Sequence, residues 1–102
     1  MVLYVCKWNI LPGKAEAYGE WALTATKKQF AVPGIKEFRA YRSVTGSHQA
    51  VATYEFADFS AWAMWMENET IQKVNQELRD YVTHIQVDLL GPSPIVPDPV
   101  RF

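Results

Sequence analysis

The stretch from residue 58 to residue 85 constrains the fold more than any other part of the chain, because its apolar residues recur at helical spacing. The apolar residues of its first half share one helical face: Phe59, Trp62, Trp65 and Met66. Those of its second half recur mostly at steps of three and four: Ile71, Val74, Leu78, Tyr81, Val82 and Ile85. Between them lies the polar run Asn68-Glu69-Thr70. The spacing predicts a short tryptophan-rich helix that starts at an N-cap on Asp58 or Ser60, followed by a longer amphipathic helix.

The remaining segments of regular pattern predict four strands and one more helix. Residues 2–9, 35–43, 48–56 and 86–90 are expected to form strands, because they are rich in β-branched and aromatic residues or alternate in polarity. Residues 14–31 carry an apolar stripe at helical spacing and end at Val32-Pro33-Gly34. The order is strand, helix, strand, strand, helical stretch, strand, the split βαβ arrangement. We therefore predict an α+β, ferredoxin-like protomer with an antiparallel four-stranded sheet and helices on one face.

The first strand indicates that the protomer does not stand alone. One face of this strand carries Tyr4 and Trp8 and the other carries Leu3 and Val5, so both faces are mainly apolar. The helices of this chain cover one face, and a second copy packed sheet to sheet would cover the other. We expect a homodimer built from a single domain over residues 1–90. Residues 91–102 contain four prolines and are expected to form an extended tail that contacts the partner subunit.

Composition excludes several classes of function. A net charge of −1 without a block of basic residues does not fit a nucleic-acid-binding protein. One cysteine, Cys6, and two isolated histidines, His48 and His84, argue against a disulfide or a metal site. No apolar run approaches the roughly 18 residues of a membrane span, so a cytoplasmic protein is expected. Four Trp, five Tyr and five Phe are many for 102 residues, and they predict an aromatic-lined cavity or interface.

Three short motifs in a fixed order resemble a known superfamily. Leu11-Pro12-Gly13-Lys14 opens the first helix, Val32-Pro33-Gly34 closes it, and Glu55-Phe56-Ala57-Asp58 leads into the tryptophan-bearing helix. Over residues 2–90 this order resembles the dimeric α/β-barrel superfamily, and within it the antibiotic-biosynthesis-monooxygenase-like proteins. The resemblance implies a ferredoxin-like protomer, two of which form a barrel, with a cavity between sheet and helices in each. It also implies cofactor-independent oxygenation of polyphenolic compounds or haem degradation.

The haem-degrading branch of that superfamily does not match residue by residue. It uses an Asn on the first strand, a Trp on the helix after the third strand and a His ten residues later. This chain keeps the Trp as Trp65 but has Cys6 and Asn75 at the other two positions. Without the histidine that position supplies no axial ligand, so we expect no haem and no other cofactor. Related cyclases use a His-Pro pair, and neither His48 nor His84 precedes or follows a proline.

Each residue of the candidate site has a possible functional role and a possible purely structural one. His84 is the candidate general base, because imidazole titrates near neutral pH, but a capping or surface role at a helix end is the alternative. Trp65 is the second candidate catalytic residue, and core packing is its alternative. The candidate substrate-binding residues are Trp62, Tyr41, Tyr54, Arg39 and Asn75. For the aromatic members the alternative is again packing, and for Arg39 it is an ion pair with Glu55 across the hairpin.

The function expected from this reasoning is that of a small cofactor-independent monooxygenase acting on an aromatic or quinone-type molecule. A non-catalytic ligand-binding or dimerisation module of the same fold is the alternative, because no complete catalytic constellation is present. A lyase, isomerase or cyclase is a third option.

Overall fold

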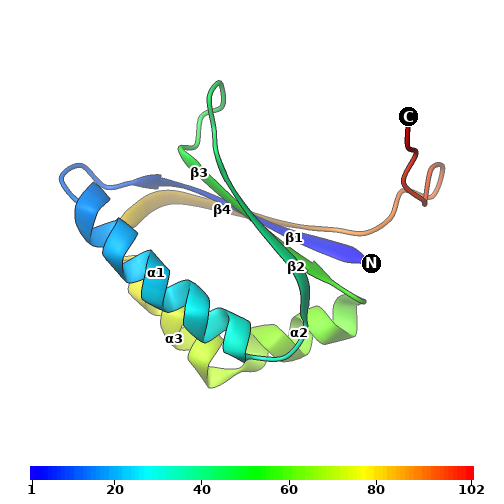
Figure 1. The fold of residues 1–102 in the computed structure, drawn as a ribbon, viewed down its shortest axis with the longest axis horizontal. Coiled ribbons are helices and arrows are strands. Elements are labelled where there is room, and N and C mark those ends of the chain that lie inside the picture. The colour runs from blue at the N-terminus through cyan, green and yellow to red at the C-terminus, as the bar shows by residue number, and fades with distance from the viewer.

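The computed structural model describes residues 1–102 and contains four strands and three helices (Figure 1). In chain order these are β1 (Val2–Ile10), α1 (Ala15–Ala31), β2 (Ile35–Arg42), β3 (Ala50–Phe56), α2 (Phe59–Glu67), α3 (Glu69–Leu78) and β4 (Val82–Leu90). The strands form one antiparallel sheet in the order β2-β3-β1-β4. All three helices cover the same face of this sheet (Figure 1). The ferredoxin-like α+β protomer predicted from the sequence is confirmed.

Alternation along the two central strands builds the core. In β1 every second side chain from Val2 to Trp8 is buried beneath the helices, and the residues between them are half-buried on the opposite face. The register between β1 and β3 places Tyr54 beside Tyr4 and Phe56 beside Val2 on the covered face. The helices add Trp65, which is buried in the same cluster. The core therefore lies between the centre of the sheet and the three helices.

The outer face of the sheet is mixed in polarity. Its apolar members lie on three strands: Leu3, Val5, Val51 and Leu90. Charged members share the same face by register: Lys7, Glu37, Arg39, Glu55 and Asp88. The outer face therefore carries apolar and charged side chains together, and it is less apolar than β1 alone indicates. The physical reason is that polar and apolar residues alternate along the edge strands β2 and β4, whose outward positions are mostly polar. The central strand β1, in contrast, carries apolar residues on both faces.

The long helix predicted through Ile85 ends much earlier. α3 stops at Leu78, a short turn follows, and Val82 begins β4 opposite Ile10 of β1. The apolar spacing continues by coincidence across the turn, while pairing with β1 makes the segment a strand. His84 consequently lies in a strand and not on a helix. It sits where the register between β1 and β4 shifts, with φ of 54°, which identifies a β-bulge.

Local hydrogen bonds explain the other helix boundaries. The Asp58 side chain accepts a hydrogen bond of 2.8 Å from the backbone N–H of Ala61, so Asp58 rather than Ser60 is the N-cap of α2. The Asn68 side chain caps α3 in the same way, accepting from Thr70 at 2.9 Å. The third strand begins at Ala50, later than expected, so His48 lies in the loop before it.

Residues 91–102 form an exposed tail without helix or strand. The tail extends past the end of β4 and away from the helices (Figure 1). Its apolar side chains are largely exposed, including Ile95 at 87% and Val100 at 63%.

Candidate functional site

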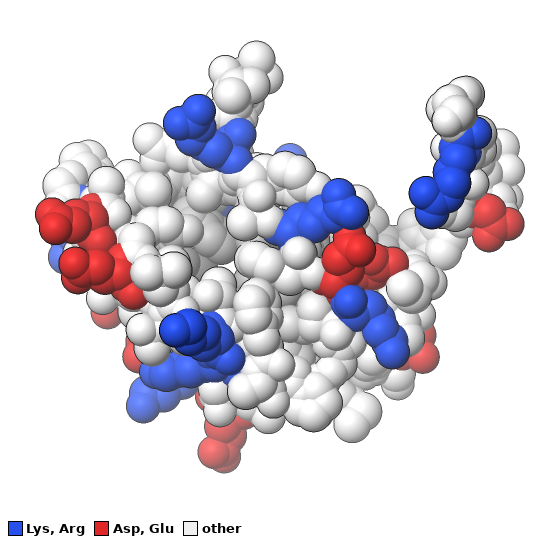
Figure 2. All heavy atoms as spheres, viewed as in Figure 1, with Lys and Arg blue, Asp and Glu red and all other residues white.

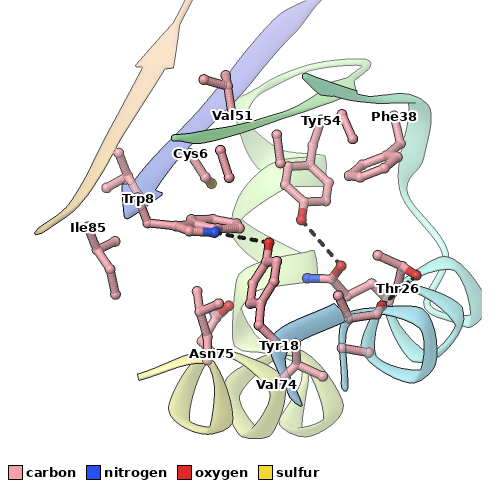
Figure 3. Close-up of a pocket in the computed structure, with 18 of the residues that line it drawn as sticks. Cys6, Trp8, Tyr18, Thr26, Phe38, Val51, Tyr54, Val74, Asn75 and Ile85 are labelled. Atoms are coloured by element: carbon pink, nitrogen blue, oxygen red, sulfur yellow. Dashed lines mark hydrogen bonds between the residues drawn. The ribbon is translucent and has the colours of Figure 1, made fainter. Parts of the chain in front are cut away.

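A cavity of about 920 Å³ lies between the sheet and the helices (Figure 3). Strands and helices both contribute to its walls, and 21 of its 28 lining residues are hydrophobic. Ligand sites for small molecules typically measure roughly 300–1,000 Å³ and are mainly apolar with a few polar groups. Figure 2 shows the corresponding hollow among mostly uncharged atoms, with charged side chains around it. The protomer therefore contains a cavity large enough for a multi-ring organic molecule.

Aromatic side chains from both layers contribute to the wall. Those from the sheet are Tyr4, Trp8, Phe38 and Tyr54, and those from the helices are Tyr18, Trp21 and Trp65. The Tyr54 ring lies at the centre of this group, 5.0 Å from the Phe38 ring and 5.3 Å from the Trp65 ring between centroids. Such edge and tilted contacts fix the ring orientations. The wall is therefore a rigid aromatic surface that matches the faces and edges of planar rings.

Two hydrogen bonds cross the cavity from sheet to helix. Trp8 Nε1 donates to Tyr18 Oη at 3.0 Å, and Tyr54 Oη donates to Gln29 Oε1 at 3.2 Å (Figure 3). Gln29 is the one buried polar residue of the core and is 6% exposed. These bonds tie α1 to the two central strands, because a buried polar group without a partner is costly.

The acidic groups of the cavity keep their protons at neutral pH. Burial raises the pKa of Tyr54 and Tyr18, and for Tyr54 the neighbouring Cys6 adds to the effect. Burial and the adjacent Cys6 likewise raise the pKa of Tyr4. Burial raises the pKa of the Cys6 thiol to about 12. The interior therefore offers neutral hydrogen-bonding groups, while two exposed cations, Arg42 and Arg79, lie among the lining residues.

Four of the seven residues predicted for the site line the cavity. Trp65 from α2 and Tyr54 from β3 form part of its aromatic wall, and Asn75 from α3 supplies a carboxamide. Tyr41 is also a lining residue, but it is 51% exposed and pairs with Val51 on β3. The alternation of β3 puts Val51 on the face opposite Tyr54, and both Val51 and Tyr41 still border the cavity.

The other three predicted residues lie elsewhere. His84 is exposed at the bulge of β4 and does not line the cavity. Trp62 packs on Tyr4 with ring centroids 5.8 Å apart, outside the cavity lining, and its Nε1 is buried without a partner. Arg39 forms an ion pair of 2.6 Å with Glu37 on its own strand, so the predicted pair with Glu55 is wrong. Residues two positions apart on a strand point to the same face, so Arg39 and Glu37 lie side by side.

Sequence reasoning missed the pair formed by Trp8 and Tyr18. In the sequence Trp8 lies on an apolar face of the first strand, and Tyr18 belongs to the apolar stripe of residues 14–31. A tyrosine in a core-facing stripe is the available signal, since a buried hydroxyl requires a partner. The identity of that partner depends on how α1 crosses the sheet, which spacing does not reveal.

The structure also bears on metal ions and membranes. No three side chains of His, Cys, Asp or Glu come together in a group that could hold a metal ion. No helix combines the length and the apolar composition needed to cross a bilayer.

Solved structures of distant relatives share this fold. A DABB family protein with a ferredoxin-like fold from Mesorhizobium loti aligns with a TM-score of 0.79 and 14% identity, over 90% of this chain and 96% of that protein. The protein At3g17210 from Arabidopsis thaliana aligns with a TM-score of 0.81 and 13% identity, over 91% and 96%. SnoaB, a cofactor-independent oxygenase from Streptomyces nogalater, aligns with a TM-score of 0.75 and 15% identity, over 95% and 97%. At these identities the likeness establishes the fold alone.

A comparison with families gives a more specific result. No protein of curated function matches the sequence significantly. The family model described as antibiotic biosynthesis monooxygenase matches residues 1–77, which includes β1 through most of α3 and most of the cavity wall. The family resemblance inferred from the three sequence motifs is thereby confirmed, and the chain belongs to the antibiotic biosynthesis monooxygenase family.

Proposed function

We propose that this protein is a cofactor-independent monooxygenase that oxidises a hydroxylated polycyclic aromatic compound of the anthrone type inside the cavity. The observation that carries the proposal is the cavity itself: about 920 Å³, aromatic on both walls and without a charged group in its interior. Membership of the antibiotic biosynthesis monooxygenase family supports the reaction class. The fold shared with SnoaB, described as a cofactor-independent oxygenase, agrees with it.

The proposed reaction needs no external reductant. A CH₂ group between two aromatic rings becomes a carbonyl, one atom of O₂ enters that carbonyl, and the other atom leaves as water with the two hydrogens. All four electrons that reduce O₂ come from the substrate. The first step is loss of a proton from the substrate, because the resulting anion gives up electrons to O₂ far more readily than the neutral compound.

The protein's contribution in this proposal is to bind, orient and stabilise that anion. Trp65 and Tyr54 form the wall that holds the rings, and Asn75 offers a neutral donor from α3. His84 lies outside the cavity, and the acids within it hold their own protons, so the substrate's proton passes to water at the mouth. The exposed cations Arg42 and Arg79 among the lining residues attract an anionic substrate.

One observation favours a second candidate, a ligand-binding protein without catalysis. Neither histidine lines the cavity, and the buried acids there titrate far above neutral pH, so the site lacks a general base. A binding protein would gain thermal stability from an anthraquinone-type ligand without consuming oxygen.

Oxygen uptake separates the two candidates. With an anthrone as substrate, the monooxygenase is expected to consume one O₂ per product, release no hydrogen peroxide and place one ¹⁸O from ¹⁸O₂ in the product carbonyl. Peroxide release, or a rate equal to that of the anthrone alone in buffer, would contradict the proposal.

A matched pair of variants tests whether the reaction takes place inside the cavity. Ala22 lines the cavity from α1, whereas Ala17 is exposed on the same helix. Ala22→Phe places a ring in the cavity and is expected to lower kcat/KM at least tenfold, while Ala17→Phe leaves it unchanged. Equal activity in the two variants would place the reaction outside the cavity.

The proposed assembly is a homodimer packed through the outer face of the sheet. Leu3, Val5 and Val51 form a half-exposed apolar centre there, and the exposed tail provides further apolar side chains that reach beyond the sheet. Analytical ultracentrifugation is expected to give twice the chain mass of 11.7 kDa at micromolar concentration. A variant with Leu3→Lys and Val5→Lys is expected to sediment as a single chain. A wild-type protein that is monomeric under these conditions would refute the dimer.

A further inference from the structure

Tyr18 presents an unused hydrogen-bond donor at the wall of the cavity. Its hydroxyl oxygen accepts a hydrogen bond from Trp8 Nε1 at 3.0 Å, and its own proton is donated to no group of the protein. A tyrosine hydroxyl has one proton to donate and lone pairs to accept with. Since the indole occupies the oxygen from one side, the proton is left for whatever fills the cavity.

The two other tyrosines inside the cavity differ from Tyr18 in their hydrogen bonds and contacts. Tyr54 donates its proton to Gln29 Oε1 and has no donor left for a ligand. Tyr4 is 9% exposed, lies next to Cys6, and packs its ring against Tyr54 and Trp62. Among Tyr4, Tyr18 and Tyr54, the half-buried Tyr18 is the one with both a partner that fixes its hydroxyl oxygen and a proton that no protein group accepts.

We propose that Tyr18, held in place by Trp8, donates its hydroxyl proton in a hydrogen bond to the ionised oxygen of the bound aromatic compound, and that the Asn75 carboxamide is the second donor. The Asn75 side chain makes no hydrogen bond within the protein, and Asn75 lines the same cavity. Figure 3 shows Tyr18 rising from α1 and Asn75 from α3 toward the sheet. The inference rests on the proposed function for the class of ligand, a phenol or enol that becomes an anion.

The electrostatics of this arrangement suit an anionic oxygen. A preorganised neutral donor in a mainly apolar cavity stabilises a developing negative charge with little reorganisation of solvent. Burial, the larger influence, raises the pKa of Tyr18, so its hydroxyl remains protonated and able to donate at neutral pH. The hydrogen bond from Trp8 acts in the opposite direction and lowers that pKa, which makes the Tyr18 hydroxyl a stronger donor than an isolated buried phenol. Trp8 is in this sense a positioning residue.

A coloured phenol tests the inference without any turnover. The probe is 2-hydroxyanthraquinone, whose absorbance reports the ionisation of its hydroxyl group, and anthraquinone serves as the matched ligand without one. Tyr18→Phe is expected to raise the pKa of the bound probe by about one unit, a tenfold shift toward the neutral form. Trp8→Phe is expected to raise the probe's pKa in the same direction by a smaller amount. Anthraquinone is expected to bind wild type and Tyr18→Phe equally.

Tyr81→Phe is the control variant, because Tyr81 stacks on Trp21 but does not line the cavity. It removes the same hydroxyl group and is expected to leave the pKa of the bound probe unchanged, with circular dichroism confirming that every variant is folded. If the probe binds Tyr18→Phe with an unchanged pKa, the inference fails while the proposed function of the cavity survives. If neither anthraquinone binds the wild-type protein, the inference and the proposed function fall together.

Discussion

The hydrogen bond between Tyr54 and Gln29 offers a quantitative test of how the sheet and α1 are held together. Tyr54 is 4% exposed and Gln29 is 6% exposed, so neither group has ready access to water if its partner is removed. Tyr54→Phe keeps the ring contacts with Phe38 and Trp65 and deletes only the hydroxyl group. It leaves the Gln29 carbonyl oxygen buried without a donor, at a cost of about 1–3 kcal/mol in the free energy of unfolding.

The same reasoning applies from the other side of the bond. Gln29→Met keeps the length of the side chain but leaves the Tyr54 hydroxyl without an acceptor, again at about 1–3 kcal/mol. The double variant removes both polar groups together, so it is expected to be within about 1 kcal/mol of wild type. In a chain of this size each kcal/mol corresponds to a change in Tm of roughly 4–8 °C.

Urea unfolding followed by far-UV circular dichroism at pH 7 measures the three variants. The double-mutant cycle is expected to give a coupling free energy of at least about 1 kcal/mol. Tyr41→Phe, which removes a hydroxyl group from a half-exposed residue, serves as the control and is expected to stay within about 0.5 kcal/mol of wild type. Additive effects of the two single changes would refute the claim that this bond is buried and coupled.

Three further predictions follow from other parts of the chain. Asp58→Ala removes the N-cap of α2 and is expected to lower the free energy of unfolding by about 1 kcal/mol, whereas Ser60→Ala has little effect; the reverse order would show that the cap is misassigned. Gly34 has φ of 132°, so Gly34→Ala is expected to lower the Tm, while Gly19→Ala, in the open interior of α1, is expected to raise it; equal shifts would contradict the backbone assignment. Burial raises the pKa of Cys6 from 9.0 to about 12 and that of the buried tyrosines above their ordinary value, so the unfolded chain loses these protons first as the pH rises. The free energy of unfolding in urea is therefore expected to be constant below about pH 9 and to fall above it by about 1.4 kcal/mol per pH unit for each such group. Cys6→Ala is expected to move the start of this fall to higher pH. A fall that begins below about pH 8 would contradict this assignment.

The fold was predictable because most of its helices and strands are indicated by the composition and spacing of their own residues. In β1 the residues from Val2 to Trp8 are β-branched or aromatic almost without interruption, and Pro12-Gly13 ends the segment. The junction between α3 and β4 was not predictable in this way. Leu78, Val82 and Ile85 continue a helical period across a turn, and only pairing of Val82 with Ile10 decides that the segment is a strand.

The site was predictable only in part, for a related reason. Trp65 and Tyr54 carry signals in the sequence, the first through the family resemblance and the second through alternation on its strand. The partnership of Trp8 with Tyr18 depends on the angle at which α1 crosses the sheet, and spacing along the chain does not encode that angle. His84 was placed wrongly because its assignment depended on the helix that proved to be a strand.

A crystal structure of the protein soaked with 2-hydroxyanthraquinone tests the central claim most directly. We expect the ring system to lie between Tyr54 and Trp65 on one side and α1 on the other, with its hydroxyl oxygen within hydrogen-bonding distance of Tyr18 Oη. A ligand found on the outer face of the sheet, or a cavity that stays empty at saturating ligand, would contradict the assignment of this cavity as the binding site.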